Sequence, residues 1–126
     1  MQNINIENTD FSPSIQTDFE NGTINIKGKS YPENTLEFYE PFMDALEEFL
    51  SSLPTNKLIF NLEIIYFNSS SSKKFFEIFD LLDENREKLD IEVNWIYDKE
   101  DESSKEVGEE FQEDFEELNI KLIVKQ

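Results

Sequence analysis

Four consecutive serines offer the clearest chemistry in this sequence. Asn68 precedes them, and each of Ser69, Ser70, Ser71 and Ser72 has a hydroxyl that a protein kinase could phosphorylate. A phosphate would add about −1.5 to −2 charges and three acceptor oxygens at a single point. The four serines are therefore candidates for a switch that acts through charge.

The position of these serines in the chain suits a bound anion. They stand between residues 57–67, a run typical of a buried strand, and residues 74–89, which have helical spacing. Ligands gather at the carboxyl ends of strands in open α/β sheets, and the free N–H groups and dipole of a helix start favour negative charge. The same residue types also form an ordinary helix cap without any regulation, and position alone favours that simpler interpretation.

A second cluster of reactive groups is acidic. It consists of Asp98, Glu100, Asp101 and Glu102, and clustered carboxylates at a strand end can hold Mg²⁺ or Ca²⁺. The spacing does not match an EF-hand loop, and the required glycine is missing. We therefore expect a solvated acidic loop, no metal and no cofactor, and keep a metal-dependent enzyme as an outside alternative.

The overall composition excludes several classes of function. The chain has no Cys and no His, so it lacks thiolate chemistry and the commonest general base, and Ser69 has no partner for a catalytic triad. We expect no enzymatic activity. The formal net charge of −18 disfavours binding to nucleic acid, because that binding relies on cationic side chains. An acidic surface suits a basic partner or simply keeps the protein soluble.

Length and hydropathy predict a single small domain. The 126 residues are 37% hydrophobic and include twelve Phe, enough for one core in a domain that spans residues 1–126. No apolar run approaches the roughly 20 residues that cross a bilayer. The N-terminus has neither the basic nor the apolar region of an export signal. We therefore expect a cytoplasmic protein without membrane insertion.

The N-terminal part of the chain has the pattern of a β-hairpin. Residues 14–20 and 23–27 alternate apolar and polar side chains, with Asn21 and Gly22 between them. This pair favours a type I′ turn, in which both central residues have positive φ.

A helix is expected to follow the hairpin. Asn34 or Thr35 could cap it, and Pro41 is tolerated only in a first turn, so the main helix is expected to start at Pro41 after a short helical lead-in. One apolar face is formed by Phe42, Leu46, Phe49 and Leu50.

The rest of the chain alternates strands with helices. Residues 57–67 predict a central strand covered on both sides, although Asn61 and Glu63 interrupt one face. A helix over 74–89, a strand over 91–97, a helix capped by Ser103 or Ser104 and a strand over 120–124 follow. The last helix has a stripe of Val107, Phe111, Phe115 and Leu118. This order predicts an α/β fold with a mixed β-sheet, an N-terminal hairpin toward one edge and three main helices.

Three blocks of the sequence stand out together: GKSYPENTLEFYEP at residues 28–41, LEIIYFNSSSSK at 62–73 and VNWIYDKEDESSKEVGEEF at 93–111. In their order and spacing, they resemble the SiaC family of bacterial regulatory phosphoproteins. The resemblance implies a STAS-like fold, similar to that of anti-sigma-factor antagonists. It also implies a protein whose phosphorylation is set by a Ser/Thr protein kinase and a PP2C-type phosphatase.

The family resemblance also implies a partner and a phosphoacceptor. Unmodified members bind and activate a diguanylate cyclase, which raises cyclic di-GMP and favours aggregation or biofilm growth. Aligned on Tyr66, Phe67 and Asn68, the acceptor is Ser69, where the family has threonine; Ser70 and the two serines after it form its surroundings. Serine offers the same hydroxyl without the methyl group.

The resemblance leaves two further questions open. Tyr31, Pro32, Glu33 and Asn34 either contact the partner or the phosphoacceptor turn, or simply fix the direction of the chain before the first helix. Tyr66 and Phe67 are expected to pack the strand end rather than touch a partner. The alternative client is an anti-sigma kinase, which a STAS-type antagonist would sequester.

Overall fold

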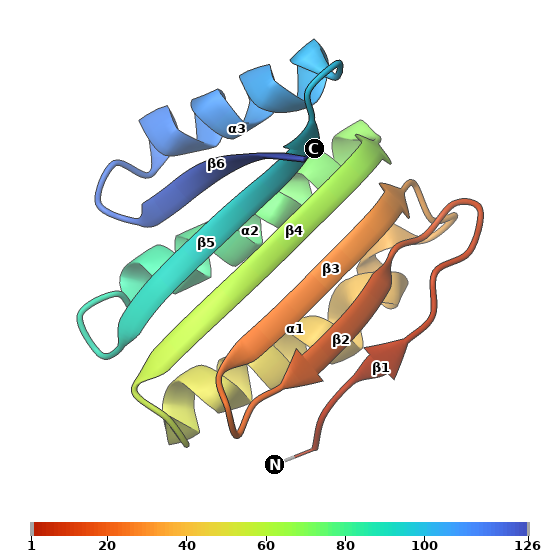
Figure 1. Cartoon of the computed structure of the whole chain (residues 1–126). Helices are drawn as coiled ribbons and strands as arrows, with labels where there is room; N and C mark the ends of the chain where they lie inside the picture. Colours follow the sequence, from red (N-terminus) through yellow and green to blue (C-terminus); the bar gives the residue numbers. More distant parts are fainter. Residues whose placement is uncertain (1, 126) are drawn as a thin grey trace.

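The computed structural model describes residues 2–125, in which six strands form one sheet with the spatial order of the sequence, β1 to β6 (Figure 1). The strands are β1 (Asn5–Ile6), β2 (Ser14–Asp18), β3 (Thr23–Ser30), β4 (Lys57–Phe67), β5 (Asp90–Asp98) and β6 (Asn119–Lys125). The helices are α1 (Thr35–Ser52), α2 (Ser69–Glu84) and α3 (Glu102–Asp114). The pairs β1–β2 and β2–β3 are antiparallel, and β3 to β6 run parallel, so the predicted mixed sheet is confirmed.

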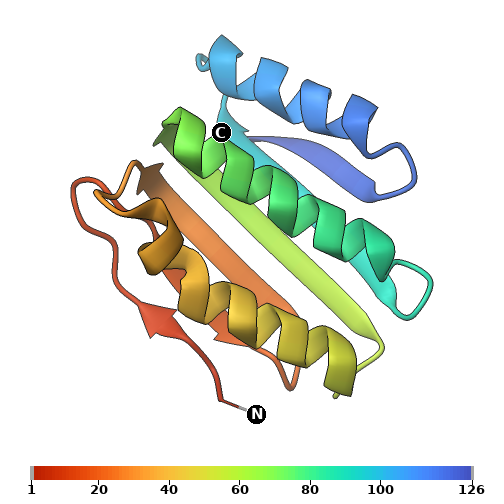
Figure 2. The ribbon, with the colours of Figure 1, turned by 180° about the vertical axis from the view of Figure 1, so that it is seen from behind.

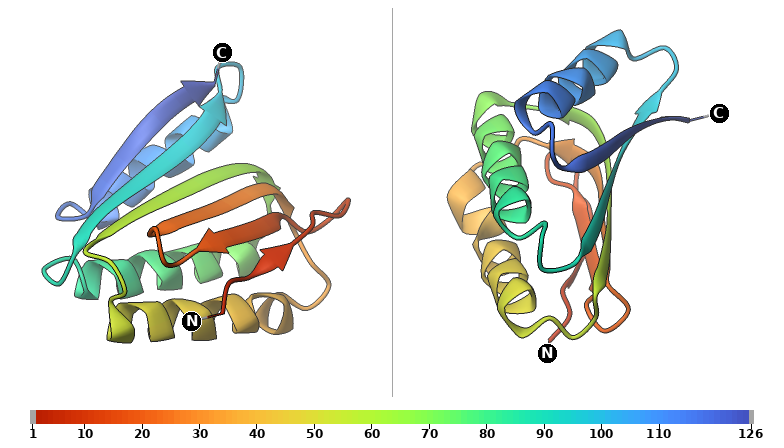
Figure 3. Two further views of the ribbon diagram at one scale, coloured as in Figure 1. Left: turned by 60° about the horizontal axis from the view of Figure 1, so that its bottom comes forward. Right: turned by 90° about the vertical axis from the view of Figure 1, so that its left-hand side faces the viewer.

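All three helices cover the same face of the sheet, as Figures 2 and 3 show. Each helix connects two neighbouring parallel strands. Because all three connections have the same hand and each new strand is added at the same edge of the sheet, every helix lies on the same side. The core lies between these layers and includes Phe42, Phe60, Phe79 and Trp95, all fully buried. Within residues 2–125, no helix has the length and apolar character needed to cross a membrane.

The prediction that β4 is covered on both sides is wrong. Leu58, Phe60, Leu62 and Ile64 are buried under the helices, but the opposite face of β4 has no helix over it. On that face, Asn61 donates to Asn25 at 2.9 Å and accepts from Asn94 at 2.8 Å, and Lys125 bridges to Glu63 at 2.7 Å. These polar side chains bond to one another across the strands, which explains why Asn61 and Glu63 interrupt the apolar run.

The turn between β2 and β3 also differs from the prediction. Gly22 has positive φ, but among the described residues Leu53 is the only non-glycine with positive φ, so Asn21 does not fit a type I′ turn. The last strand pair is Asp18 with Thr23, which leaves a four-residue connection. Phe19 turns into the core beside Phe49, with ring centroids 5.4 Å apart, and this burial ends the ladder early.

The first helix starts earlier than the main helix was expected to. Asn34 caps α1, and the helix continues through Pro41 without a break. Pro41 is exposed, while Tyr39 and Phe42 on either side are buried, so core packing outweighs the loss of one backbone hydrogen bond.

The other two helices also have unexpected bounds. Helix α2 ends at Glu84, short of Leu89, which packs in the core after the helix. Helix α3 is capped by Asp101 rather than by a serine, and it ends before Phe115. The short edge strand β1 was not predicted, because two residues carry no periodic signal.

Candidate functional site

The serine run forms the first turn of α2 rather than a separate loop. Asn68 is the N-cap, and its Oδ1 accepts a hydrogen bond from the Ser71 N–H at 2.9 Å. The helix therefore begins at Ser69, well before residue 74, where the helical spacing predicted its start. The cap is supplied by Asn68, so the serine hydroxyls are not needed for capping.

The four serines differ in accessibility, and the helix start decides the difference. Ser69 and Ser70 are exposed, Ser72 is half-buried and Ser71 is fully buried. A kinase needs access to the hydroxyl, so Ser69 and Ser70 are the accessible candidates of this turn. The structure thus places the predicted acceptor Ser69 at the surface, at the carboxyl end of β4 and the amino end of α2.

Ser71 has a structural role at the base of this turn. Ser30 Oγ donates to Ser71 Oγ at 2.8 Å, and the hydroxyls of Ser30 and Tyr39 lie 2.6 Å apart. Because the single proton of Ser30 goes to Ser71, Tyr39 is the donor of the second bond. Burial raises the pKa of Tyr39 to about 12. The three hydroxyls tie α2, the end of β3 and α1 together.

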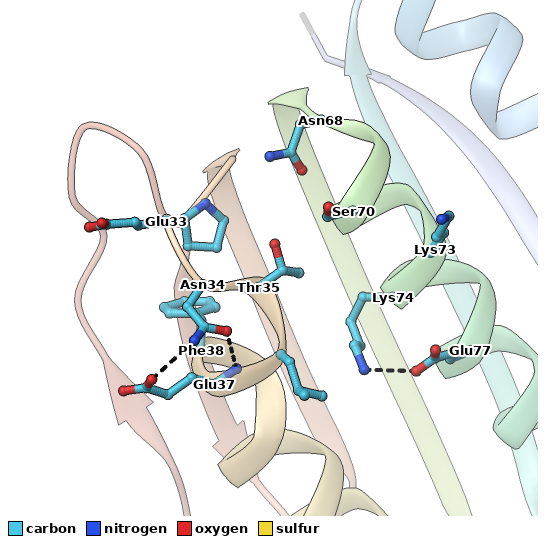
Figure 4. Close-up of a pocket in the computed structure, with 12 residues that line it drawn as sticks. Glu33, Asn34, Thr35, Glu37, Phe38, Asn68, Ser70, Lys73, Lys74 and Glu77 are labelled. Atoms are coloured by element: carbon cyan, nitrogen blue, oxygen red, sulfur yellow. Dashed lines mark hydrogen bonds and ion pairs between the residues drawn. The ribbon is translucent and has the colours of Figure 1, made fainter.

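A groove of about 1030 Å³ lies between the starts of α1 and α2 (Figure 4). Three of the four residues predicted to bind a partner line it, namely Pro32, Glu33 and Asn34. From the other side it is lined by Asn68, Ser70, Lys73, Lys74 and Glu77. In Figure 4, Ser70 and Lys74 stand across the groove from Thr35. Segments more than thirty residues apart in the sequence are thus brought together at one surface.

Asn34 has a structural role as well as a place in the groove. Its Oδ1 accepts from the Glu37 N–H at 3.1 Å, and its Nδ2 donates to the Glu37 carboxylate at 3.2 Å. This reciprocal contact fixes the first turn of α1. Pro32 is buried and Glu33 is exposed, so Glu33 presents an accessible charge on this side of the groove.

The two lysines after the serines differ in their partners. Lys74 Nζ donates to Glu77 Oε2 at 2.7 Å. Lys73 is exposed and takes part in no ion pair within residues 2–125. Lys73 follows Ser69 by four positions, which places both side chains on the same side of the helix.

Tyr31 lies beside the groove in contact with other aromatic side chains. Its ring meets Tyr66 edge-on at 5.2 Å, and Phe11 lies 6.4 Å away on its other side. Phe67 packs against Phe75 and the core as expected. Tyr66 does not follow that expectation, because its side chain is 55% exposed.

The acidic residues at the end of β5 serve the start of α3. Asp101 Oδ1 accepts from the Ser104 N–H at 3.0 Å, and Asp98 Oδ1 accepts from the Glu100 N–H at 2.9 Å. In the part of the chain that the structure describes, no three Asp or Glu side chains are grouped to hold a metal ion. These contacts give the carboxylates a local structural role in the loop.

Sequence reasoning missed Ser30, the side-chain partner of Ser71, and Tyr39, which bonds to Ser30. They lie 41 and 32 residues before Ser71, so only the fold brings their hydroxyls together. What the assembled site can do chemically is accept a phosphate at an exposed helix start beside a groove.

Comparison with known proteins agrees with this geometry. The model of the SiaC family of regulatory phosphoproteins matches residues 6–125. An uncharacterized protein of Pseudomonas aeruginosa strain UCBPP-PA14 is 36% identical over 115 residues, 90% of each chain. The structure of SiaC of Pseudomonas aeruginosa is 31% identical, with a TM-score of 0.88 over 99% of this chain and 100% of that one.

A second solved structure adds a complex. It is that of the diguanylate cyclase SiaD with its activator SiaC from Pseudomonas aeruginosa, in which the matching chain is 32% identical with a TM-score of 0.89. The match covers 97% of this chain and 99% of that one. With a family model that spans nearly all of its residues, the chain belongs to the SiaC family of regulatory phosphoproteins.

Proposed function

We propose that this protein is a phosphorylation-controlled partner switch whose unmodified form binds and activates a diguanylate cyclase. Its output is a higher level of cyclic di-GMP, which favours aggregation or biofilm growth. The related SiaC is the activator of the cyclase SiaD, which supports this choice of client. The protein itself catalyses no reaction; a Ser/Thr protein kinase and a PP2C-type phosphatase set its state in the cytoplasm.

One observation carries this proposal. Ser69 and Ser70 are exposed in the first turn of α2, and Ser70 lines the groove that the start of α1 completes, so Ser69 stands next to a residue of the groove. A partner docked against Pro32, Glu33 and Asn34 therefore meets whatever group these serines carry. We assign Ser69 as the acceptor, with Ser70 as the neighbouring alternative.

A phosphate on Ser69 leaves the fold intact. The first turn of a helix has free N–H groups and a positive dipole end, which stabilise negative charge by about 0.3 to 1 kcal/mol. Lys73 is free to pair with the phosphate from one turn further along the helix. Modification at Ser71 would instead bury a charge in the core.

The same phosphate weakens a docked partner. An interface that covers Ser69 must strip water from the phosphate oxygens, and a buried charge without partners costs several kcal/mol of binding. Glu33, Glu37 and Glu77 already line the groove, so an acidic partner segment would also be repelled. Phosphorylation therefore acts as the release signal.

The proposal is tested by a pull-down from host lysate, with the retained proteins identified by mass spectrometry. The baits are wild type, Ser69→Ala and Ser69→Glu, with Ser103→Glu as the matched control. Ser103 is also an exposed serine in the first turn of a helix, but in α3. The control adds the same charge in the first turn of a helix whose residues do not line the groove.

The outcomes of the pull-down separate the possible clients. A diguanylate cyclase retained by wild type, Ser69→Ala and Ser103→Glu and lost with Ser69→Glu supports the switch. Retention of an anti-sigma kinase in its place would identify a STAS-type antagonist and overturn the cyclase assignment. If all four baits retain the same proteins, Ser69 is no more than part of a helix start.

A further inference from the structure

Exposed apolar side chains gather at the end of the sheet that carries the serine turn. Phe11, Tyr31, Leu36, Ile65 and Tyr66 are all exposed there, between 37% and 65% of their surface. Phe11 belongs to the connection between β1 and β2, which Figure 1 shows beside the ends of β3 and β4. Large exposed apolar patches of this kind mark interaction sites rather than ordinary surface.

Three of these side chains form a continuous aromatic row, Phe11, Tyr31 and Tyr66. Neighbouring ring centroids are 6.4 Å apart for Phe11 and Tyr31 and 5.2 Å apart for Tyr31 and Tyr66. The row is fixed by the backbone, because the Tyr31 N–H donates to the Phe11 carbonyl at 2.8 Å and the Tyr31 hydroxyl donates to the Asp10 carbonyl at 2.9 Å. A fixed row loses little side-chain freedom when a partner covers it.

The row adjoins the phosphoacceptor turn. Ser30, the residue before Tyr31, accepts the N–H of Asn68 through its carbonyl at 3.1 Å, and Tyr66 precedes Ser69 by three positions. The surrounding segments carry no charge: residues 11–17, 30–32 and 64–72 contain no Asp, Glu, Lys or Arg. In a chain with 32% charged residues, the charges lie at the border of this surface: exposed Asp10 and Glu33 are acidic, and exposed Lys29, which pairs with Tyr66 between β3 and β4, is basic.

Aromatic residues and a shortage of charge are what distinguish the centre of a protein interface from its rim. We propose that the aromatic row is the central anchor of the interface with the cyclase, and that its occupant is an apolar segment of the cyclase flanked by Lys or Arg. The inference rests on the proposed function and adds a surface to it. The apolar segment covers the row, and its basic flanks face the acidic residues of the border.

The proposed occupant accounts for the direction of the switch. A phosphate on Ser69 gains little from basic residues at the rim, since exposed ion pairs are weak and screened by salt. It loses much more when an apolar segment strips its water at the edge of the row. The loss exceeds the gain, so phosphorylation releases the partner although part of that partner is basic.

The experiment is calorimetric titration with the purified cyclase that the wild-type pull-down identifies. The variants are Tyr66→Ala and Phe11→Ala, and Phe76→Ala is the matched control, because Phe76 is 46% exposed and Phe11 is 49% exposed. Phe76 lies against Phe115 instead of the row. Circular dichroism confirms that each variant is folded, and Phe11→Ala in a loop keeps the test open if Tyr66→Ala does not fold.

We expect the affinity to fall roughly thirtyfold or more for Tyr66→Ala or Phe11→Ala, as at an interface hot spot, and less than about threefold for Phe76→Ala. Phosphorylation of the folded variants by the cognate kinase should be unchanged. If both row variants bind within about threefold of wild type while Ser69→Glu does not bind, the aromatic row is not the anchor and the switch stands. If the wild type binds no cyclase, the proposed function fails, and the inference fails with it.

Discussion

Replacing Tyr39 with Phe tests the buried hydroxyl chain beneath the serine turn. Tyr39 is fully buried and donates to Ser30, which in turn donates to Ser71. At pH 8 the variant loses one buried hydrogen bond and leaves one acceptor of Ser30 without a donor. We expect the free energy of unfolding to fall by about 1 kcal/mol.

The same substitution should change how stability depends on pH. Burial favours the neutral phenol of Tyr39 and raises its pKa from the ordinary value of 10.0 to about 12 in the folded protein. The unfolded chain therefore releases the proton first as the pH rises, and the stabilisation is complete below pH 10 and is lost between pH 10 and 12. A pKa shift of two units corresponds to about 2 to 3 kcal/mol of stability. Tyr39→Phe has no phenol hydroxyl at this position, so its stability does not fall by this amount.

The two effects predict a crossing of the stability curves. Wild type is more stable at pH 8, and the variant becomes the more stable protein above a crossing at roughly pH 10.5 to 11. The assay is urea unfolding across this pH range, followed by the fluorescence of the single tryptophan, Trp95. Tyr66→Phe is the control, since it alters an exposed side chain and should change stability at pH 8 by less than about 0.5 kcal/mol. Parallel curves for wild type and Tyr39→Phe from pH 8 to 11.5 would refute the reasoning.

Three further predictions have defined outcomes in thermal or urea unfolding. Asn68→Ala removes the cap of α2 and should lower the free energy of unfolding by about 1 kcal/mol, whereas Asn68→Asp can still cap the helix and should keep most of the stability. Equal stability of the two variants would contradict the capping role. Gly22→Ala should lower the free energy of unfolding by at least about 2 kcal/mol, because φ is positive at residue 22 and a Cβ there would collide with the Lys57 carbonyl oxygen. An unchanged melting temperature would show that the turn relaxes around the added methyl group. Ser71→Glu buries a charge and should abolish folding, while Ser69→Glu places a charge at the exposed helix start and should keep or slightly raise the melting temperature. The opposite result would show that α2 does not start at Ser69.

The sequence predicted the parts of the fold that long patterns determine. The apolar run at residues 57–67 matches β4 at both ends, and the alternation of strands with helices correctly implied a mixed sheet. The same run was wrongly expected to be covered on both faces. Asn61 and Glu63 were the signal of an uncovered face, since polar residues at every second position belong to a strand with one face open.

Details that depend on a shift of one or two residues could not be predicted. The sequence alone does not show that α2 starts at Ser69, and this start decides that Ser71 is buried and Ser69 exposed. Ser30, which bonds to Ser71, and Tyr39, which bonds to Ser30, come from two other elements, so no local pattern marks them. Tyr66 was expected to pack at the strand end, and its exposure becomes visible only when its neighbour Tyr31 is placed beside it.

The central claim is that phosphate on the serine turn switches off a cyclase activator. The most direct measurement is cyclic di-GMP production by the purified cyclase with increasing amounts of this protein, before and after treatment with its kinase, together with phosphopeptide mapping. The proposed switch predicts stimulation by the unmodified protein, no stimulation by the treated protein, and phosphate on Ser69 or its exposed neighbour Ser70. Equal stimulation by both forms, or no phosphate between Ser69 and Ser72, would contradict it.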